Sequence, residues 1–333
     1  MASHDRKLKW GIVGSGKICK DFAIALRSLP GTQEIVANAA RSKDSARKFG
    51  EEHQIAKSYG SYAEMFADSE VEVVYIGLVI SAHCSTVIEA LKAGKHVLCE
   101  KPLGANRAEV LQMIQTAKEC NRFLMEAYWT RFFPVYKEIK RRLDANDIGD
   151  VGFVTAKFGF GTLSPTALDR NLAGGTFISI GYYLPALTNF VFGRNPTKII
   201  AKADLNSDGA DISGLAYLEY GEGKAASILW TSLAHIESDA VIVGTKGCLR
   251  IPRYVWCPIE LIDTAGQRKE YPLPPSVVEG IHFNYQGMQY EADAVRDSIL
   301  NGNTECPEHT LADTLALFEV LDEIQEQLTK SSI

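Results

Sequence analysis

Residues 8–19 read LKWGIVGSGKIC: a short apolar run passes directly into a turn with two glycines and then into residues with helical spacing. Gly14 permits a tight turn from a strand into a helix, and Gly16 lets the backbone approach a ligand closely. The first turn of such a helix offers unpaired N–H groups and a partial positive charge, both of which suit a pyrophosphate. A structural turn without a ligand is the alternative. We expect this loop to bind a dinucleotide through Gly14, Gly16, Lys17 and Ile18.

The region after the second expected strand indicates whether the dinucleotide is NAD(H) or NADP(H). It reads NAARS from residue 38, and no acidic residue lies between Glu34 and Asp44. An acid here would hold the ribose hydroxyls of NAD and repel the 2′-phosphate of NADP. Arg41 can pair with that phosphate and Ser42 can donate to it, so the sequence predicts NADP(H) as the cofactor. An arginine that only begins a solvated helix is the alternative.

The chain changes character along its length. Residues 1–128 alternate short apolar strands with helices, which predicts an α/β domain with a Rossmann-type, doubly wound parallel sheet. From about residue 149, short strands follow one another through hairpin turns, and two helices, at about 285–301 and 310–328, close the chain. This pattern predicts a C-terminal α+β domain, residues 129–333, built on a large, mostly antiparallel open sheet.

The composition excludes several classes of protein. Lys and Arg number 35 and Asp and Glu 41, so the net charge is −6, and without a basic block we expect no nucleic-acid partner. No apolar stretch reaches the ~20 residues of a membrane span and no signal peptide is recognisable, so we expect no membrane association and a cytoplasmic location. The 7 cysteines are scattered without a C-x-x-C pair, which predicts reduced thiols and no metal site.

A second informative stretch, residues 93–102, reads AGKHVLCEKP and places Lys101 directly after an expected strand. In open α/β sheets, ligands bind at the carboxyl ends of the strands. The stretch resembles the signature of the glucose–fructose oxidoreductase/inositol dehydrogenase family. Similar motifs are spread along nearly the whole chain: GIVGSGKI at 11–18, His83 after the fourth strand, Gly174-Gly175, and GTKG at 244–247. Within the family, FLMEAYWTRFFP at 123–134 resembles a segment of the dimeric dihydrodiol dehydrogenases.

The resemblance implies a catalytic pair. The family pattern G-G-x-x-x-D-x-G-x-[HY] starts at Gly174 here, which puts Tyr183 at the acid/base position and Ser179 at the place of the usual Asp. Tyrosine has an ordinary pKa of about 10, so proton transfer near neutral pH needs a nearby positive charge, which Lys101 would supply. A core aromatic is the alternative for Tyr183.

The resemblance also implies binding residues. For the cofactor these are His83, Glu100 and Lys101, in addition to the loop residues named above. The substrate would be bound by the residues Trp129, Arg131, Phe158, Ser179, Trp256 and Phe283. Packing in the core or at a dimer interface is the alternative for each aromatic member of this set.

The expected activity is that of an oxidoreductase. It would transfer hydride between NADP(H) and a vicinal diol, either a trans-dihydrodiol or a pyranose sugar such as D-xylose, with Tyr183 as acid/base assisted by Lys101. The alternatives are an inositol or other sugar-derivative dehydrogenase of the same family, or a non-catalytic NADP-binding regulatory protein.

The sequence also predicts an assembly. Apolar residues alternate at 227–233 and 240–243, and the face that they form needs a cover. By resemblance, we expect a homodimer in which two copies pack through the C-terminal sheet. Helices of the same chain are the alternative cover.

Overall fold

The computed structural model describes residues 6–161 and 163–330, which form two compact units. Residues 6–132 and 273–314 make up the first unit, and residues 133–272 and 315–330 make up the second. Residues 273–314 therefore pack with the N-terminal part of the chain, although the order of elements in the sequence groups them with the C-terminal part.

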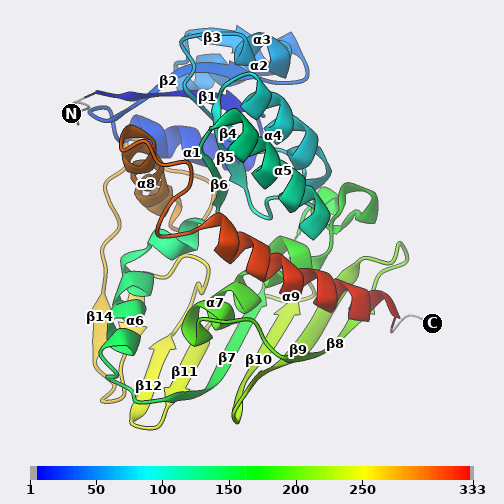
Figure 1. Ribbon diagram of the computed structural model, residues 1–333, viewed down its shortest axis with the longest axis vertical. Helices are drawn as coiled ribbons and strands as arrows, with labels where there is room; N and C mark the ends of the chain where they lie inside the picture. Colours follow the sequence, from blue (N-terminus) through cyan, green and yellow to red (C-terminus); the bar gives the residue numbers. More distant parts are fainter. Residues whose placement is uncertain (1–5, 162, 331–333) are drawn as a thin grey trace. The chain divides into compact units, whose positions relative to one another are not determined.

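A six-stranded parallel sheet forms the centre of the first unit (Figure 1). Its strand order is β3-β2-β1-β4-β5-β6, and every neighbouring pair is parallel. The strands are β1 (Leu8–Val13), β2 (Gln33–Ala39), β3 (Lys57–Tyr59), β4 (Val73–Ile76), β5 (His96–Glu100) and β6 (Leu124–Ala127). This order confirms the expected doubly wound fold. It also puts the carboxyl ends of β1 and β4 at the switch point, where such sheets bind ligands.

Helices flank this sheet. They are α1 (Lys17–Arg27), α2 (Lys43–His53), α3 (Tyr62–Phe66), α4 (His83–Lys92), α5 (Arg107–Cys120) and α8 (Met288–Leu300). Helix α1 packs on α8, and α4 packs on α5. Ser42, Ser61 and Asn106 each accept a hydrogen bond from the backbone N–H three residues later. These caps satisfy N–H groups that have no partner within the helix, which is why α2, α3 and α5 begin where they do.

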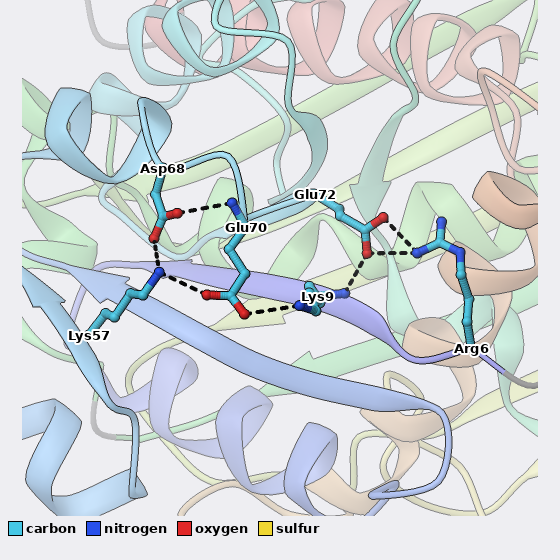
Figure 2. Close-up of polar contacts among 6 residues, drawn as sticks. All are labelled: Arg6, Lys9, Lys57, Asp68, Glu70 and Glu72. Carbon is cyan, nitrogen blue, oxygen red and sulfur yellow. Dashed lines mark hydrogen bonds and ion pairs between the residues drawn. The ribbon is translucent and has the colours of Figure 1, made fainter.

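Ionic contacts join the amino-terminal ends of β1, β3 and β4 (Figure 2). Lys57 Nζ lies 2.8 Å from both Asp68 Oδ2 and Glu70 Oε2, and Lys9 Nζ lies 2.9 Å from Glu70 Oε1. The whole cluster, which we call the ion network, consists of Arg6, Lys9, Lys57, Asp68, Glu70 and Glu72. Because the strands are parallel, this edge lies opposite the switch point, so the ion network bears on stability rather than on ligand binding.

An eight-stranded sheet forms the second unit, in the order β14-β13-β12-β11-β7-β10-β9-β8. The strands are β7 (Val151–Gly159), β8 (Lys198–Leu205), β9 (Asp211–Gly221), β10 (Lys224–Thr231), β11 (Ala240–Gly244), β12 (Gly247–Ile251), β13 (Glu260–Ile262) and β14 (Arg268–Glu270). Strands β7 and β10 are parallel, and the other neighbouring pairs are antiparallel. The expected large, mostly antiparallel sheet is thereby confirmed.

Helices cover one face of this sheet (Figure 1). They are α6 (Pro134–Asp144), α7 (Tyr183–Phe192) and α9 (Leu311–Lys330), and a π-helix, Phe177–Gly181, precedes α7. Helix α7 contacts β7 and β10, and Gln327 of α9 hydrogen-bonds the backbone of β8 at Ile199 and Ala201. None of the helices in the described ranges has both the length and the apolar character needed to cross a membrane.

Large apolar side chains remain exposed on the same sheet. They are Ile200, Leu215, Tyr217, Leu229 and Val243, together with Leu233 just after β10, and between 39% and 65% of each residue's surface is accessible. Leu229 lies opposite Leu215 in the strand register, and Ile200 lies opposite Tyr217. These four residues therefore share one face of the sheet. We call these four residues the apolar sheet face.

Candidate active site

The loop after β1 fits a dinucleotide. Gly14 has a φ of +109°, and a Cβ there would lie 2.7 Å from Gly77 O, so this position needs glycine. A Cβ on Gly16 would meet nothing within 4 Å, so the space in front of the helix is open. Gly16 is the N-cap of α1, and no side chain caps this helix. The N–H groups of its first turn, including those of Lys17 and Ile18, are therefore suited to a pyrophosphate.

Cys19 stands where the dinucleotide fingerprint has its third glycine. The side chain is fully buried, and Sγ donates to Gly77 O over 3.3 Å. Burial raises the pKa of this thiol to about 12, so it stays neutral and unreactive at physiological pH. A small, neutral thiol allows the close packing of helix against strand that glycine provides in the fingerprint.

Arg41 and Ser42 follow directly after β2, whose carboxyl end lies beside that of β1. Arg41 is exposed. The Ser42 hydroxyl accepts from Ser45 N at 3.2 Å and donates to Ser45 Oγ at 2.9 Å, so it caps α2. Of the two expected phosphate ligands, Arg41 is therefore the one whose side chain is not engaged in a helix cap.

Lys101 follows the last residue of β5, at the carboxyl edge of the parallel sheet. Burial disfavours its ammonium form and lowers its pKa to about 8, although the charges of Glu100 and Glu126 oppose this shift. Glu100 Oε2 accepts from Lys101 N at 3.2 Å, and Glu100 Oε1 accepts from Tyr75 Oη at 2.6 Å. A lysine with a pKa of about 8 is mostly cationic at neutral pH but releases its proton readily, which suits a group that assists proton transfer.

Glu126 fixes the turn that follows Lys101. Its side chain is fully buried, and Oε1 accepts from Leu103 N at 2.9 Å. Oε2 accepts from Thr314 Oγ1 at 3.0 Å and lies 3.5 Å from His309 Nε2. In the sequence, Glu126 belongs to the segment 123–134 that resembles a family segment. No spacing of residues predicts its contact with the turn after Lys101.

His83 joins two loops at the same edge of the sheet. Its Nδ1 lies 2.9 Å from Pro102 O, and its Nε2 lies 3.1 Å from Leu78 O. The ring is buried, which lowers the pKa of the imidazole. His83 therefore holds the turn of Lys101 against the loop that follows β4.

The second unit surrounds Tyr183 with aromatic rings. Tyr183 is the first residue of α7 and is 6% exposed. Its ring centroid lies 5.9 Å from that of Phe158, which in turn stacks on Trp256 at 4.1 Å with an interplanar angle of 8°. Tyr254 meets the edge of Trp256 at 5.4 Å. The fold thus brings together Tyr183, Phe158 and Trp256, which the sequence predicted as site residues from three distant segments.

Ser179 and Asp211 organise the segment that leads to Tyr183. Ser179 Oγ donates to Ala167 O at 3.0 Å. Asp211 Oδ2 accepts from Phe177 N and from Trp230 Nε1, both at 2.7 Å, and burial raises the pKa of this carboxyl. Asp211 thus anchors the amino end of the π-helix. Asp211 is the first residue of β9, and no motif or spacing in the sequence predicts this contact.

The remaining predicted substrate residues belong to the first unit. Trp129 lies in a 3-10 helix, Trp129–Phe132, and is 6% exposed, whereas Phe283 is 51% exposed. Arg131 Nε donates to Glu308 O at 2.9 Å, as expected for an arginine with a largely covered side chain. Lys101 and the dinucleotide loop also lie in this unit, whereas Tyr183 lies in the second.

Comparisons with known proteins find matches along nearly the whole chain. A family model described as an oxidoreductase family with an NAD-binding Rossmann fold matches residues 8–128, and a Gfo/Idh/MocA C-terminal domain model matches residues 136–250. Trans-1,2-dihydrobenzene-1,2-diol dehydrogenase of Xenopus tropicalis is 40% identical over 323 residues, which cover 96% of this chain and 98% of that protein. The Homo sapiens protein of the same name is 38% identical over 324 residues, covering 96% and 97%.

One solved structure shows how closely the fold is shared. An aldose-aldose oxidoreductase from Caulobacter crescentus superposes with a TM-score of 0.84 at 21% sequence identity. The match covers 98% of this chain and 99% of the other. At this level of identity the likeness shows the fold.

Proposed function

The chain belongs to the Gfo/Idh/MocA oxidoreductase family, and we propose that it is an NADP-dependent dehydrogenase of vicinal diols. The family makes it an enzyme that uses a nicotinamide cofactor. The substrate class we propose is a trans-dihydrodiol or a pyranose sugar such as D-xylose, and the near full-length similarity to dihydrodiol dehydrogenases supports the dihydrodiol most directly. The observation that carries the chemistry is Lys101, a lysine with a pKa of about 8 at the carboxyl edge of the parallel sheet.

The cofactor in this proposal is NADP(H), which supplies the hydride acceptor or donor when it is bound. Gly14, Gly16, Lys17 and Ile18 hold the pyrophosphate at the uncapped end of α1. The exposed Arg41 pairs with the 2′-phosphate, with Ser42 beside it. His83, Glu100 and Lys101 form the part of the cofactor site at the ends of β4 and β5.

Tyr183 acts as the acid/base in this proposal. When the alcohol is oxidised, its carbon loses a hydride and its O–H proton passes to the Tyr183 phenolate. Lys101 supplies the positive charge that favours the phenolate and binds the reacting oxygen. In the reverse direction Tyr183 donates the proton as the carbonyl receives the hydride.

The substrate ring would be held by aromatic side chains. Phe158 and Trp256 already stack on one another beside Tyr183, which supports their assignment to the substrate site. Trp129 and Phe283 are the further aromatic candidates, and Arg131 and Ser179 are the polar ones. Aromatic faces bind both the flat ring of a dihydrodiol and the C–H face of a sugar.

The test is an absorbance assay at 340 nm with NADP⁺ or NAD⁺. The substrates are trans-benzene dihydrodiol, D-xylose, D-glucose and myo-inositol. We expect turnover with NADP⁺ and with the dihydrodiol or D-xylose. Turnover with myo-inositol alone would favour the alternative of another sugar-derivative dehydrogenase. Tight NADPH binding without turnover of any substrate would favour a regulatory protein and would overturn the proposal.

We further propose that two copies pair through the apolar sheet face. A face with this many exposed apolar side chains is unfavourable in water, and the helices of this unit cover the opposite side. We also propose a cytoplasmic location. All seven cysteines are free thiols, as is usual in a reducing compartment.

A further inference from the structure

An irregular segment before α8, residues 275–284, is fastened to α1 at two points; we call it the strap. Near the carboxyl end of α1, Ser28 Oγ accepts from Val277 N at 3.2 Å. One turn into the same helix, Asp21 accepts from Ile281 N at 2.7 Å and from His282 N at 2.8 Å. The helix that begins at the dinucleotide loop therefore also holds the strap.

Asp21 is the stronger of the two attachments. Its side chain is fully buried, and Oδ2 accepts a third hydrogen bond, from His282 Nδ1, at 2.6 Å. A buried carboxylate needs donors, and here these three donors come from two consecutive residues of the strap. An asparagine at this position would turn an NH₂ group toward N–H donors, so it could not reproduce the full set. The anionic side chain of Asp21 is thus matched to the hydrogen-bond donors of the strap.

The Asp21 end of the strap lies beside the turn of Lys101. Burial raises the pKa of the Glu100 carboxyl, and among the groups that oppose this rise Tyr75 and Lys101 act more strongly than the His282 imidazole. Glu100 accepts from Tyr75 Oη, and the Tyr75 ring stacks on Phe22 at 3.9 Å with an interplanar angle of 11°. Phe22 is the neighbour of Asp21 on α1. The contact of Asp21 with Ile281 and His282, which we call the clamp, and the end of β5 are therefore parts of one connected cluster within the first unit.

The strap presents an aromatic ring next to the clamp. Phe283 directly follows His282, and half of its surface is exposed. On its other side, Asn284 adopts a left-handed φ of 55° and Tyr285 donates to Ser276 Oγ at 2.8 Å. The backbone of Phe283 is thus held from both sides. Fixing an exposed aromatic ring in this way reduces the conformational entropy lost when it binds another ring.

We propose that Asp21 and His282 are positioning residues that hold Phe283 beside the Lys101 turn, where its ring contacts the ring of the substrate. This inference rests on the proposed function, because the substrate is the cyclic diol assigned there. Asp21 and His282 act through the strap backbone and take no part in the proton transfer. They set the affinity for the substrate ring and leave cofactor binding unchanged.

The experiment compares Asp21→Asn and His282→Ala with Ser28→Ala, which removes the strap's other attachment and serves as the matched control. Hydrogen exchange at residues 281 and 282 reports on the clamp without needing activity. We expect Asp21→Asn to speed this exchange and to raise KM for trans-benzene dihydrodiol about tenfold, the order expected when a hydrogen bond to a charged group is lost. His282→Ala, which keeps both backbone hydrogen bonds, should raise KM less. Ser28→Ala should leave KM unchanged, and kcat and the Kd of NADPH should stay near the wild-type values in all three variants.

A double-mutant cycle tests whether Asp21 changes KM through Phe283. If Asp21 acts through Phe283, then Asp21→Asn should raise KM hardly at all in a Phe283→Ala background. Equal effects in both backgrounds, unchanged exchange in Asp21→Asn, or an equal loss of NADPH affinity would each overturn the inference. Wild-type protein that turns over no diol would contradict the proposed function instead, while the exchange data would still decide whether Asp21 fixes the strap.

Discussion

At the scale of single residues, burial sets the pKa of the titratable side chains Lys101 and Cys19. Lys101 has a lowered pKa because burial removes water from its ammonium group, and Cys19 has a raised pKa because burial penalises its thiolate. Both follow the same rule, that burial disfavours the charged form. The rule makes the lysine ready to exchange a proton near neutral pH and makes the cysteine inert.

The first prediction at this scale concerns the proposed catalytic pair. Tyr183→Phe should lower kcat by roughly 10²–10⁴, the usual contribution of a general acid/base, and should leave NADPH affinity nearly intact. Lys101→Met should also lower kcat. Steady-state kinetics with NADPH fluorescence titration measure both quantities. Turnover at the wild-type level in either variant would remove that residue from the proposed mechanism.

The pKa of Lys101 gives this pair a pH dependence. Below pH 8 the lysine is mostly cationic and can stabilise the negative charge that develops on the reacting oxygen when the carbonyl receives the hydride, and this stabilisation fades as the pH rises through about 8. We therefore expect carbonyl reduction, which needs protonated groups, to decline above about pH 8. A reduction rate that stays flat between pH 7 and pH 10 would contradict the role of the Lys101 charge.

The second prediction concerns cofactor choice. Arg41→Ala should weaken the binding of NADPH by about tenfold, as expected when a charge-assisted contact to a phosphate is lost, and should barely change the binding of NADH. Fluorescence titrations with the two cofactors make the comparison. Equal weakening of both would show that Arg41 does not bind the 2′-phosphate.

At the scale of elements, local sequence signals agree well with the structure. Ser42, Ser61 and Asn106 are residue types typical of helix starts, and each caps the helix that follows it. The segment from Phe177 to Phe192 consists of a π-helix and α7, which begins at Tyr183. Pro185 lies in the first turn of α7, where a missing N–H group has no cost.

The third prediction belongs to the ion network, which joins three strands. The hydrogen bond from Lys57, together with one from the Glu70 backbone N–H, lowers the pKa of Asp68 to about 2, below the ordinary value of about 4. The network therefore stabilises the fold above about pH 4, and this stabilisation is lost as the pH falls from about 4 to about 2. Lys57→Met should lower the Tm at pH 7 and flatten this acid dependence, with KM unchanged.

Thermal unfolding between pH 2 and pH 7 measures this effect. Lys140→Met, which removes an exposed ion pair within α6, is the matched control and should change the Tm less. The effect of Lys57→Met should shrink in concentrated salt, because the network is partly exposed. An equal Tm change in the two variants would show that the network contributes no more than an isolated surface pair.

At the scale of the whole molecule, the apolar sheet face is the surface through which we propose that two copies pair. The fourth prediction is that Leu229→Glu converts the proposed dimer into a monomer, because the new charge would be buried between two copies. Leu111→Glu is the matched control, since Leu111 is 40% exposed on α5 and Leu229 is 41% exposed on β10. Sedimentation at micromolar concentration distinguishes the two forms. A monomeric wild-type protein would contradict the dimer.

The sequence by itself determined the class of each sheet, the dinucleotide loop and the place of Lys101. These features depend on the chain's local order: strand, glycine turn and helix are contiguous, and a residue after a parallel strand must lie at the sheet's carboxyl edge. Only the tertiary structure decided that residues 273–314 return to the first unit, that Asp211 anchors the segment before Tyr183, and that Asp21 holds the strap. Each of these contacts joins residues far apart in the chain, such as Asp21 and His282. A buried carboxylate accepts hydrogen bonds from the N–H groups that the fold places beside it. No spacing of residues in the sequence predicts which N–H groups these are.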